Sequence, residues 1–520
     1  MIYKTERMRA MTKYVVLVEA GQKQKYIFKS NKLAENIGAS FIIRDVTENE
    51  PGKFYNRDTT RVIYEGGGNA LYLFPDKAAG KKFSEEFSKR ILEAYPGLVL
   101  YLVGYEPGKS ETAKNGIDKC YGLLARKKLE RDHSACTVDF GNTERCVNTN
   151  LPAAVHENEG SLPETIASDK LSSESIEKYR AGFLEKNKHF KKLENAVRPY
   201  RFPSELDELG RTKNVKSYIA VVHIDGNRMG ARISRFNQEY PPIGAGENID
   251  EYDTKYIQAL SELSKNIRDK FEDAFVGMLE ELKENMPKIK NKISLEEGVL
   301  PIRPLILAGD DICFVSDGRV GVALARTYLE KLRKEKLNGE QLNACAGVAI
   351  VKSHYPFSRA YDLAEELCRN GKNAVRETAG GADYDASFID WHIEQGELDD
   401  SIDAIREKNY VADDGSLMYM RPYIVDDSGS EFAVENFDCA LKSVRDTEKI
   451  PHSKAKRLRE VIRKGKAETE YFLNSNLLTE DFGRTLNLDG EAGFRKIGGR
   501  ERSLLYDAVE MMDLYTDWRG

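Results

Sequence analysis

The chain has 520 residues, of which 41% are hydrophobic and 32% charged, and its formal net charge is −6. This length favours roughly three or four domains, and no apolar run approaches the roughly 20 residues that a transmembrane helix needs. The near balance of acidic and basic residues gives no support for general nucleic-acid binding, although a local basic groove is compatible with it. The N-terminus lacks the apolar stretch of a signal peptide, so we expect a cytoplasmic protein.

The seven cysteines are scattered and odd in number, which argues against a disulfide framework. A zinc site needs close pairs of ligands, and the sequence has no CxxC motif. Cys136 and Cys146, with His133 nearby, are the only candidates for such a site. We interpret the cysteines as free thiols and keep zinc at Cys136 and Cys146 as the alternative.

Residues 1–105 are predicted to form one domain with the element order β-α-β-β-α-β, the split βαβ pattern of ferredoxin-like folds. Apolar runs predict the strands, and apolar residues at helical spacing predict the helices. Strands are expected at 14–20, 41–46, 60–65 and 98–106, helices at 22–38 and 81–95, and a glycine-rich turn between two strands at 66–70.

Residues 106–212 are charged and loop-rich, and we interpret them as a linker or insert domain. Residues 213–395 repeat the β-α-β-β-α-β order, which indicates two copies of one unit. Residues 396–520 are predicted to be mostly helical, including 453–476 and 499–518. The predicted fold class is therefore α+β, with two ferredoxin-like βαββαβ domains, a helical insert between them and a C-terminal helical domain.

The first motif with chemical meaning is HIDGNRMG, where an apolar strand ends at Ile224 and Asp225. A carboxylate at a strand end can bind a metal ion, and the main-chain N–H groups of the following turn can cradle a triphosphate. The structural alternative is that Asp225 only caps a helix. The turn residues assigned to nucleotide binding are Gly226, Asn227, Arg228, Met229 and Gly230.

The second motif is LILAGDDICFV, in which two apolar strands flank Gly309, Asp310 and Asp311. Adjacent carboxylates repel each other, so this pair is costly at a hairpin tip unless a cation shares it. An ordinary turn is the alternative, but it explains one aspartate better than two.

In a βαββαβ sheet the first strand lies beside this hairpin, so the two motifs are expected to meet at one edge. Three carboxylates there suit two Mg²⁺ or Mn²⁺ ions. Two such ions can activate an attacking hydroxyl and neutralise the leaving pyrophosphate. The residues assigned to the metal site are Ile224, Asp225, Asp310 and Asp311.

A basic residue should also reach the triphosphate, and Lys372 in RNGKNAVRE is the first choice, ahead of Arg228 and Arg376. A solvated surface lysine is the alternative. The first domain has glycines and Asn69 where the second has Gly-Asp-Asp, so it offers no carboxylate to a metal ion. Because glycines allow close approach of a nucleotide, Gly66, Gly67, Gly68 and Asn69 are assigned to a second substrate pocket, with a purely structural turn as the alternative.

At these residues the sequence resembles the CRISPR polymerase family, the large subunit of type III CRISPR effectors, and more distantly diguanylate cyclases and class III nucleotide cyclases. QKYIFKSNKLAENIGAS and GGGNALYLF resemble the first palm domain of that family. DGNRMG, RPLILAGDDICFV, LAEELCRNGK and SFIDWHI resemble its second palm domain. LMYMRPY, followed by helices, resembles the start of its C-terminal helical domain.

The resemblance implies that the second palm joins ATP into cyclic oligoadenylates, a second messenger in antiviral defence, with release of pyrophosphate. Asp225, Asp310 and Asp311 match the metal-binding carboxylates of the family. The partners it implies are ATP and a protein or RNA, with no membrane, and an oligomer is compatible with the sequence. Ala308 replaces the first glycine of the usual Gly-Gly-Asp-Asp turn, and both carboxylates remain. Many members of the family begin with a His-Asp nuclease domain, whereas this sequence begins almost directly with the palm, so we expect no DNase activity.

Two other functions stay open. The palms could be a non-catalytic scaffold that binds nucleotide or RNA, although a scaffold has no need of three converging carboxylates. The product could also be a cyclic dinucleotide or a cyclic mononucleotide, which the sequence does not separate from longer rings.

Overall fold

The computed structural model describes residues 14–130, 141–154, 166, 169–184, 191–209, 217–244, 247–290, 292–293, 295–377, 385–396, 401–427, 429–446, 448, 450–480 and 493–518. The chain divides into two compact units, which are described separately below. Unit 1 comprises Met1–Asn195, Arg228–Asp273 and Leu305–Asp311, and unit 2 comprises Ala196–Asn227, Ala274–Pro304 and Ile312–Gly520. Both helices and mixed sheets are present, so the predicted α+β class is confirmed.

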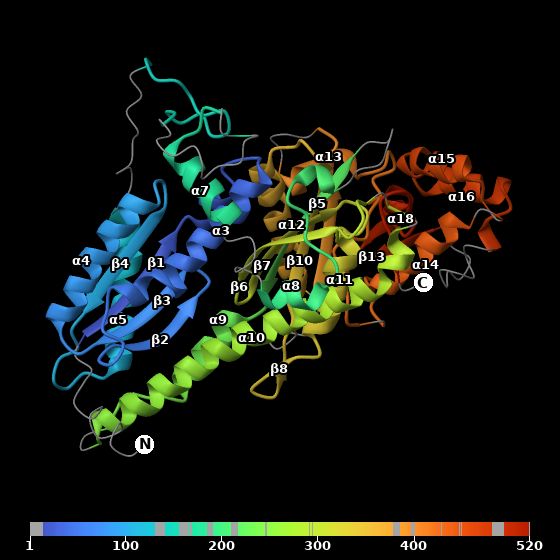
Figure 1. The fold of residues 1–520 in the computed structure, drawn as a ribbon. Helices are drawn as coiled ribbons and strands as arrows, with labels where there is room; N and C mark the ends of the chain where they lie inside the picture. The colour runs from blue at the N-terminus through green and yellow to red at the C-terminus, as the bar shows by residue number, and fades with distance from the viewer. Residues whose placement is uncertain are drawn as a thin grey trace. The chain divides into compact units, whose positions relative to one another are not determined.

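Unit 1 contains a four-stranded antiparallel sheet with the order β2-β3-β1-β4 (Figure 1). Its strands are β1 (Tyr14–Gly21), β2 (Arg61–Gly66), β3 (Asn69–Phe74) and β4 (Val99–Tyr105). The accompanying helices are α2 (Lys23–Ile27), α3 (Leu33–Glu48), α4 (Lys77–Ala94) and α5 (Ala113–Glu130), with the 3₁₀ helix η1 at Glu50–Lys53.

The two faces of this sheet are covered by different helices. Tyr14 lies against Gly80 of α4, and the next residue, Val15, lies against Gly116 of α5. Successive strand residues point to opposite faces, so α4 and α5 pack on opposite sides of β1. Tyr72 of β3 contacts Phe83 of α4, and its hydroxyl donates to the carbonyl of Thr47 on α3. The helices α3 and α4 therefore share one face.

The strand predicted at residues 41–46 is wrong, because these residues lie inside α3. The side chains of Ile42, Ile43 and Val46 are buried, and burial continues around most of the helix. A helix that is buried on nearly all sides loses the amphipathic pattern that identifies a helix in a sequence. A short apolar run with β-branched residues then resembles a buried strand.

The region predicted as an insert, residues 106–212, contains α5 and two further described α-helices, α7 (Ser173–Leu184) and α8 (Lys191–Val197). α7 packs against α3, and a small apolar cluster joins it to the preceding loop. The cluster consists of Ala34, Cys146, Leu171, Ile176 and Tyr179.

The large sheet of the chain has six strands in the order β12-β11-β10-β5-β7-β6. They are β5 (Tyr218–Gly226), β6 (Ile302–Ala308), β7 (Asp311–Asp317), β10 (Ala344–Lys352), β11 (Phe388–Ile393) and β12 (Tyr423–Ile424). β5 and β10 are antiparallel, whereas β10 and β11 are parallel. The helices α11 (Gly321–Leu332) and α12 (Phe357–Glu377) pack on β10.

Several other elements complete the middle of the chain. α9 (Met229–Gln238) follows β5, and α10 (Ile249–Lys290) is a single helix of 42 residues. The 3₁₀ helix η3 spans Leu206–Glu208, and β8 (Lys336–Leu337) pairs with β9 (Glu340–Gln341).

The C-terminal region contains α13 (Ile402–Asn409), α14 (Val434–Arg445), α15 (His452–Arg463), α16 (Lys466–Ser475) and α18 (Tyr506–Met511), drawn in orange and red in Figure 1. It also contains the hairpin β13 (Phe494–Ile497) and β14 (Arg500–Ser503). The helix predicted to begin near residue 499 is therefore wrong at its start. Gly498 and Gly499 both have positive φ, as the tight turn of a hairpin requires.

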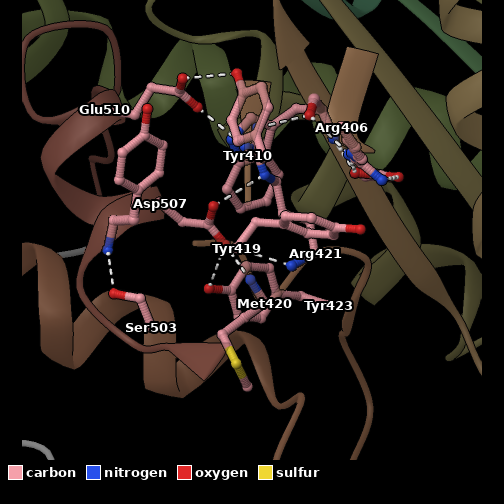
Figure 2. A network of polar contacts seen from close by, with 12 residues as sticks. Arg406, Tyr410, Tyr419, Met420, Arg421, Tyr423, Ser503, Asp507 and Glu510 are labelled. Carbon is pink, nitrogen blue, oxygen red and sulfur yellow. Dashed lines mark hydrogen bonds and ion pairs between the residues drawn. The ribbon is translucent and has the colours of Figure 1, made fainter. Parts of the chain in front are cut away.

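A buried charge network attaches α18 to the large sheet (Figure 2). Arg421 is fully buried and pairs with Asp507 and Glu510 of α18, both at 3.0 Å. The same guanidinium donates to the main-chain carbonyl of Trp391 on β11 at 2.7 Å. Because an unpaired buried charge is costly, each of these groups depends on the others.

Six of the cysteines lie in described residues, and all six are free thiols, as expected. Within the described residues, no helix is both long enough and apolar enough to cross a membrane.

Candidate functional site

Asp225 stands near the end of β5, and its partner in the structure is Lys372. The ammonium of Lys372 donates to the carboxylate of Asp225 and, at 3.3 Å, to the main-chain carbonyl of Gly226. The two side chains are 39% and 27% exposed, so the pair lies at the surface of unit 2 and is open to a ligand. Lys372 is on α12, which packs against β5. The structure thus brings together two residues that the sequence assigned to phosphate and metal chemistry.

The turn after Asp225 is held by both the main chain and the side chain of Asn227. The N–H of Asn227 donates to the carbonyl of Asn343 at 2.9 Å, and its side-chain amide donates to the carbonyl of Ala386 at 2.8 Å. The buried Asn227 side chain therefore fixes the turn rather than facing solvent. Arg228 has φ 57°, in the left-handed region, and Met229 then begins α9. Gly230 is exposed, and an added Cβ would meet nothing within 4 Å.

Two buried residues support Asp225 from the same strand. Ile224 is fully buried, and its main chain pairs with Ala346 of β10. His223 is also buried, and its Nδ1 lies 3.3 Å from the hydroxyl of Tyr361. Burial lowers the pKa of His223, although the charge of Asp225 opposes that shift. His223 is therefore a neutral support at neutral pH.

The second motif forms the tight connection between β6 and β7. Gly309 has φ 72° and Asp311 is the first residue of β7. β7 is the neighbour of β5 in the large sheet, so the strand that carries Asp225 and the strand that begins with Asp311 are adjacent. Asp225 belongs to unit 2, and Asp310 and Asp311 belong to unit 1.

Within unit 1, the glycine-rich turn lies against the Asp310-Asp311 turn. Gly66, Gly67 and Gly68 have φ values of 134°, 62° and 80°, and Asn69 then begins β3. A Cβ added to Gly67 would lie 3.3 Å from the Cβ of Ala308. Glycine is therefore needed at this turn both for its backbone conformation and for the close approach of the two segments.

A pocket opens between these two turns and the helices α2 and α3. It holds about 430 Å³ of empty space, and this volume includes the open solvent at its mouth. Its polar lining consists of Lys23, Gln24, Ser40, Arg44 and Asp311, with Gly67, Gly68 and Ala308 as the small residues.

The sequence did not single out Lys23, Ser40 or Arg44. Lys23 donates to the main-chain carbonyl of Gly67 at 2.6 Å, and Ser40 donates to the carbonyl of Leu305. Their roles depend on tertiary contacts between segments far apart in the sequence, so no local pattern marks them. Two basic residues beside a glycine-rich turn are nevertheless suited to bind phosphate.

No group of three or more His, Cys, Asp or Glu in the described part of the chain is arranged to hold a metal ion. The chemistry of the donors still fits a hard divalent cation, because Asp225, Asp310 and Asp311 all offer carboxylate oxygens. The metal assignment remains a prediction.

The zinc alternative rests on Cys136 and Cys146. Cys136 and His133 lie outside the described residues, whereas Cys146 is buried with its Sγ 3.5 Å from the hydroxyl of Ser175. Burial alone would raise the pKa of Cys146, but hydrogen bonds, first among them that of Ser175, lower it to about 7.

Comparison with solved structures identifies the fold. A Csm1-Csm4 cassette in complex with one ATP has a TM-score of 0.53 and 12% identity, with 97% of this chain and 70% of that chain covered. The cassette in complex with cA4 has a TM-score of 0.52 and 12% identity, with 98% and 71% covered. Csm1 of T. onnurineus has a TM-score of 0.51 and 14% identity, with 98% and 72% covered.

The chain has the fold of Csm1. These structural neighbours are Csm1 chains, so the resemblance found in the sequence is confirmed at the level of the fold. The likeness to Csm1 extends over nearly the whole chain. No protein-family model matches the sequence, and no curated protein matches it.

Proposed function

We propose that this chain is a nucleotidyltransferase that converts ATP into a cyclic oligoadenylate, with release of pyrophosphate, for antiviral signalling. The observation that carries the proposal is the pocket of unit 1, where a glycine-rich turn, two basic side chains and Asp311 face the same space. Csm1-Csm4 structures with this fold have been solved with ATP, cA3 and cA4, which supports the same chemistry here.

In this proposal the two β-α-β-β-α-β segments are palm domains. The strand order β2-β3-β1-β4 of the first and the run β10-β5-β7-β6 of the second both follow the split βαβ pattern. The first palm has only glycines and Asn69 at its turn, so it would bind a nucleotide without metal. The second palm would carry the reaction.

The Asp225–Lys372 pair suggests how the triphosphate is received. Lys372 neutralises Asp225 and is partly exposed, so it can exchange the carboxylate for a phosphate oxygen when a nucleotide binds. The exchange trades one charge-assisted hydrogen bond for another, so it costs little free energy. It also releases the Asp225 carboxylate to bind a cation.

Asp225, Asp310 and Asp311 would hold Mg²⁺ or Mn²⁺. When bound, such ions would neutralise the charge on the reacting phosphates and lower the pKa of the attacking 3′-hydroxyl. Lys372 and the exposed end of the turn at Gly230 would orient the triphosphate. Lys23, Arg44 and Gly67 would orient the second nucleotide in the unit 1 pocket.

The test is product analysis. The purified chain is incubated with ATP and Mg²⁺ or Mn²⁺, with and without RNA and candidate protein partners, and products are identified by mass spectrometry. The variant Asp310→Ala/Asp311→Ala should form no product. The control Asp207→Ala/Asp250→Ala removes two exposed aspartates outside the proposed site and should keep full activity.

Product formed by the Asp310→Ala/Asp311→Ala variant would show that the reaction takes place at another site. If the wild type forms no product under any of these conditions, the chain is a nucleotide-binding scaffold and the catalytic proposal is wrong.

A further inference from the structure

The pocket of unit 1 has two basic side chains in its lining, and one of them is already bound to a carboxylate. Arg44 of α3 is paired with Glu48, the last residue of the same helix, with 2.8 Å between Nε and Oε2. Lys23, the other basic residue, donates to the main-chain carbonyl of Gly67. A phosphate that enters the pocket therefore has to compete with Glu48 for Arg44.

Glu48 also lies against the glycine-rich turn. A Cβ built on Gly66 would be 3.4 Å from Oε1 of Glu48 and 3.9 Å from Nη1 of Arg268, so these two opposite charges lie beside the same residue of the turn. Arg268 belongs to α10, and it donates to the main-chain carbonyl of Glu65 at 3.3 Å. The carboxylate of Glu48 therefore has Arg44 as its partner and a second cation, Arg268, close by.

The charges around this turn affect one another. Burial raises the pKa of Glu65, the charge of Glu48 raises it further, and the charge of Arg268 opposes the shift. The carboxylates of Glu48 and Glu65 thus lie together beside a pocket that is proposed to receive an anionic ligand. A phosphate that takes Arg44 leaves the charge of Glu48 without its partner, and Arg268 is placed to neutralise it.

The structural alternative is an ordinary pair on a helix surface, because opposite charges at positions i and i+4 of a helix often interact. Lys82 and Glu86 on α4 form such a pair, in which the charged atoms are 3.9 Å apart and the side chains are 74% and 51% exposed. Arg44 and Glu48 are only 38% and 18% exposed. A surface role alone does not explain why this pair joins the lining of the pocket to the glycine-rich turn.

A second alternative assigns Glu48 the opposite effect. A carboxylate can orient an arginine for its ligand, in which case Glu48 would strengthen the binding of phosphate by Arg44. The two roles are separated by the sign of one measured quantity, namely the change in ATP affinity when the charge of Glu48 is removed.

We propose that Glu48 is an internal competitor of phosphate for Arg44, and that Arg268 receives the Glu48 carboxylate when a nucleotide binds. The proposal rests on the nucleotide-binding part of the proposed function and adds how that binding is regulated. The apparent affinity of a ligand falls with the fraction of molecules in which its site is available. Glu48 therefore weakens the binding of every ligand that uses Arg44, the product included, and so favours product release. A ligand without phosphate does not use Arg44 and is unaffected.

The test measures binding of ATP and of adenosine to the full chain by isothermal titration calorimetry. EDTA is present, so that no metal-dependent site contributes, and Arg44→Gln identifies the part of the ATP binding that belongs to this pocket. The variants are Glu48→Gln, Arg268→Gln and Glu48→Gln/Arg268→Gln. The control Glu86→Gln removes the carboxylate of the exposed pair on α4.

Glu48→Gln should bind ATP about two- to fivefold more tightly than the wild type, the factor that corresponds to an exposed ion pair. Arg268→Gln should bind ATP more weakly, because Glu48 then loses the cation that receives it. In the Glu48→Gln background Arg268→Gln should have no further effect, since it acts through Glu48. All these variants should bind adenosine like the wild type, and Glu86→Gln should also bind ATP like the wild type.

Several results would overturn the proposal. Weaker ATP binding by Glu48→Gln would show that Glu48 orients Arg44 for phosphate, and unchanged binding would reduce the pair to a surface contact. An equal gain for adenosine would show that Glu48 does not act through phosphate. An effect of Arg268→Gln that persists in the double variant would show that Arg268 does not act through Glu48.

Equal ATP binding by Arg44→Gln and the wild type would remove the premise that Arg44 binds phosphate, and would overturn the proposal as well. None of these measurements requires conversion of ATP. The expected pattern in a chain that forms no product would therefore support the role of Glu48 and contradict only the catalytic part of the proposed function.

Discussion

The main chain of Gly38 on α3 lies directly against the main-chain carbonyl of Lys178 on α7: a Cβ built on Gly38 would be 1.7 Å from that oxygen. Gly182 approaches α3 in the same way, since its Cβ would be 2.6 Å from the carbonyl of Ala34. Two glycines therefore allow the insert helix to cross α3 at backbone contact. Buried Lys178 secures the crossing, because it donates to the carbonyl of Tyr26 at 2.6 Å and pairs with Glu174 at 2.7 Å.

We predict that Gly38→Ala destabilises the protein, although alanine is the better helix former. The methyl group would separate the two helices, and overpacking of this kind costs typically about 1–3 kcal/mol. The midpoint of chemical or thermal unfolding measures the effect. α3 also carries Ser40 and Arg44 into the unit 1 pocket, so nucleotide binding there should weaken.

Gly122→Ala is the matched control. Gly122 lies in the helix α5, and an added Cβ meets nothing within 4 Å. This substitution should be neutral or stabilising, by up to about 1 kcal/mol. Equal stability of Gly38→Ala and the wild type would contradict the tight crossing.

The sequence predicted best where buried strands carry an apolar pattern. The strands that contain Val15–Val18 and Ile219–Ile224 are almost fully buried, and both were found from their apolar runs. The hairpin at residues 494–503 was missed because its residues are mainly charged, and only Phe494 and Ser503 are buried. Its pairing depends on the turn at Gly498 and on contacts with the loop at Leu417.

The candidate site was predictable only in part, for a similar reason. Asp225 could be selected because it lies at the end of an apolar strand, and Lys372 because it is a basic residue near the end of the last helical segment of the same domain; the structure pairs them. Lys23 and Arg44 could not be selected, because they reach the pocket only through the packing of α2 and α3 against distant segments. The sequence contains the chemistry of these residues but not their place in space.

We predict that Asp507→Asn strongly destabilises unit 2. Asp507 is fully buried, pairs with Arg421 and accepts hydrogen bonds from the N–H of Met420 and the hydroxyl of Tyr423, both at 2.9 Å (Figure 2). Removing its charge leaves Arg421 with Glu510 as its remaining acidic partner in this network. Loss of one partner of a buried pair costs about 3–5 kcal/mol, which denaturant unfolding would measure.

An exposed acidic residue of the same region provides the control for Asp507→Asn. Asp513→Asn alters an acidic residue that is half exposed and pairs with His452 and Lys456 at 2.9 Å. Exposed pairs contribute at most about 1 kcal/mol, so this variant should unfold close to the wild type. A similar small effect for Asp507→Asn would show that the buried network contributes little to stability.

We predict that the stability of Asp253→Asn, relative to the wild type, increases as the pH rises. Burial, the largest cause, raises the pKa of Asp253 from 3.8 to about 6, although a hydrogen bond from the N–H of Ala113 opposes the shift. Folding therefore favours the protonated form of Asp253. The stability that this form contributes is fully present below pH 3.8 and is lost as the pH rises through about 6.

The asparagine can still accept the hydrogen bond of Ala113 but never ionises. The difference in unfolding temperature between Asp253→Asn and the wild type should thus move in favour of the variant across the same pH range. A difference that is constant with pH would show that the carboxyl is not perturbed by folding.

We predict that Lys372→Met weakens the binding of ATP but strengthens the binding of a divalent cation at Asp225. The ammonium is the cation that neutralises Asp225, so its removal leaves the carboxylate free to bind a divalent cation while the triphosphate loses a positive partner. The apparent KM for ATP should rise at least about tenfold, since a charge-assisted hydrogen bond contributes about 1.5–3 kcal/mol. The Mn²⁺ concentration needed for half-maximal activity should fall, because Lys372 no longer competes for Asp225.

Arg376→Met, one turn further along α12, serves as the control and should change neither quantity. A rise in the required Mn²⁺ together with an unchanged KM would show that Lys372 helps to organise the metal site instead of binding the nucleotide.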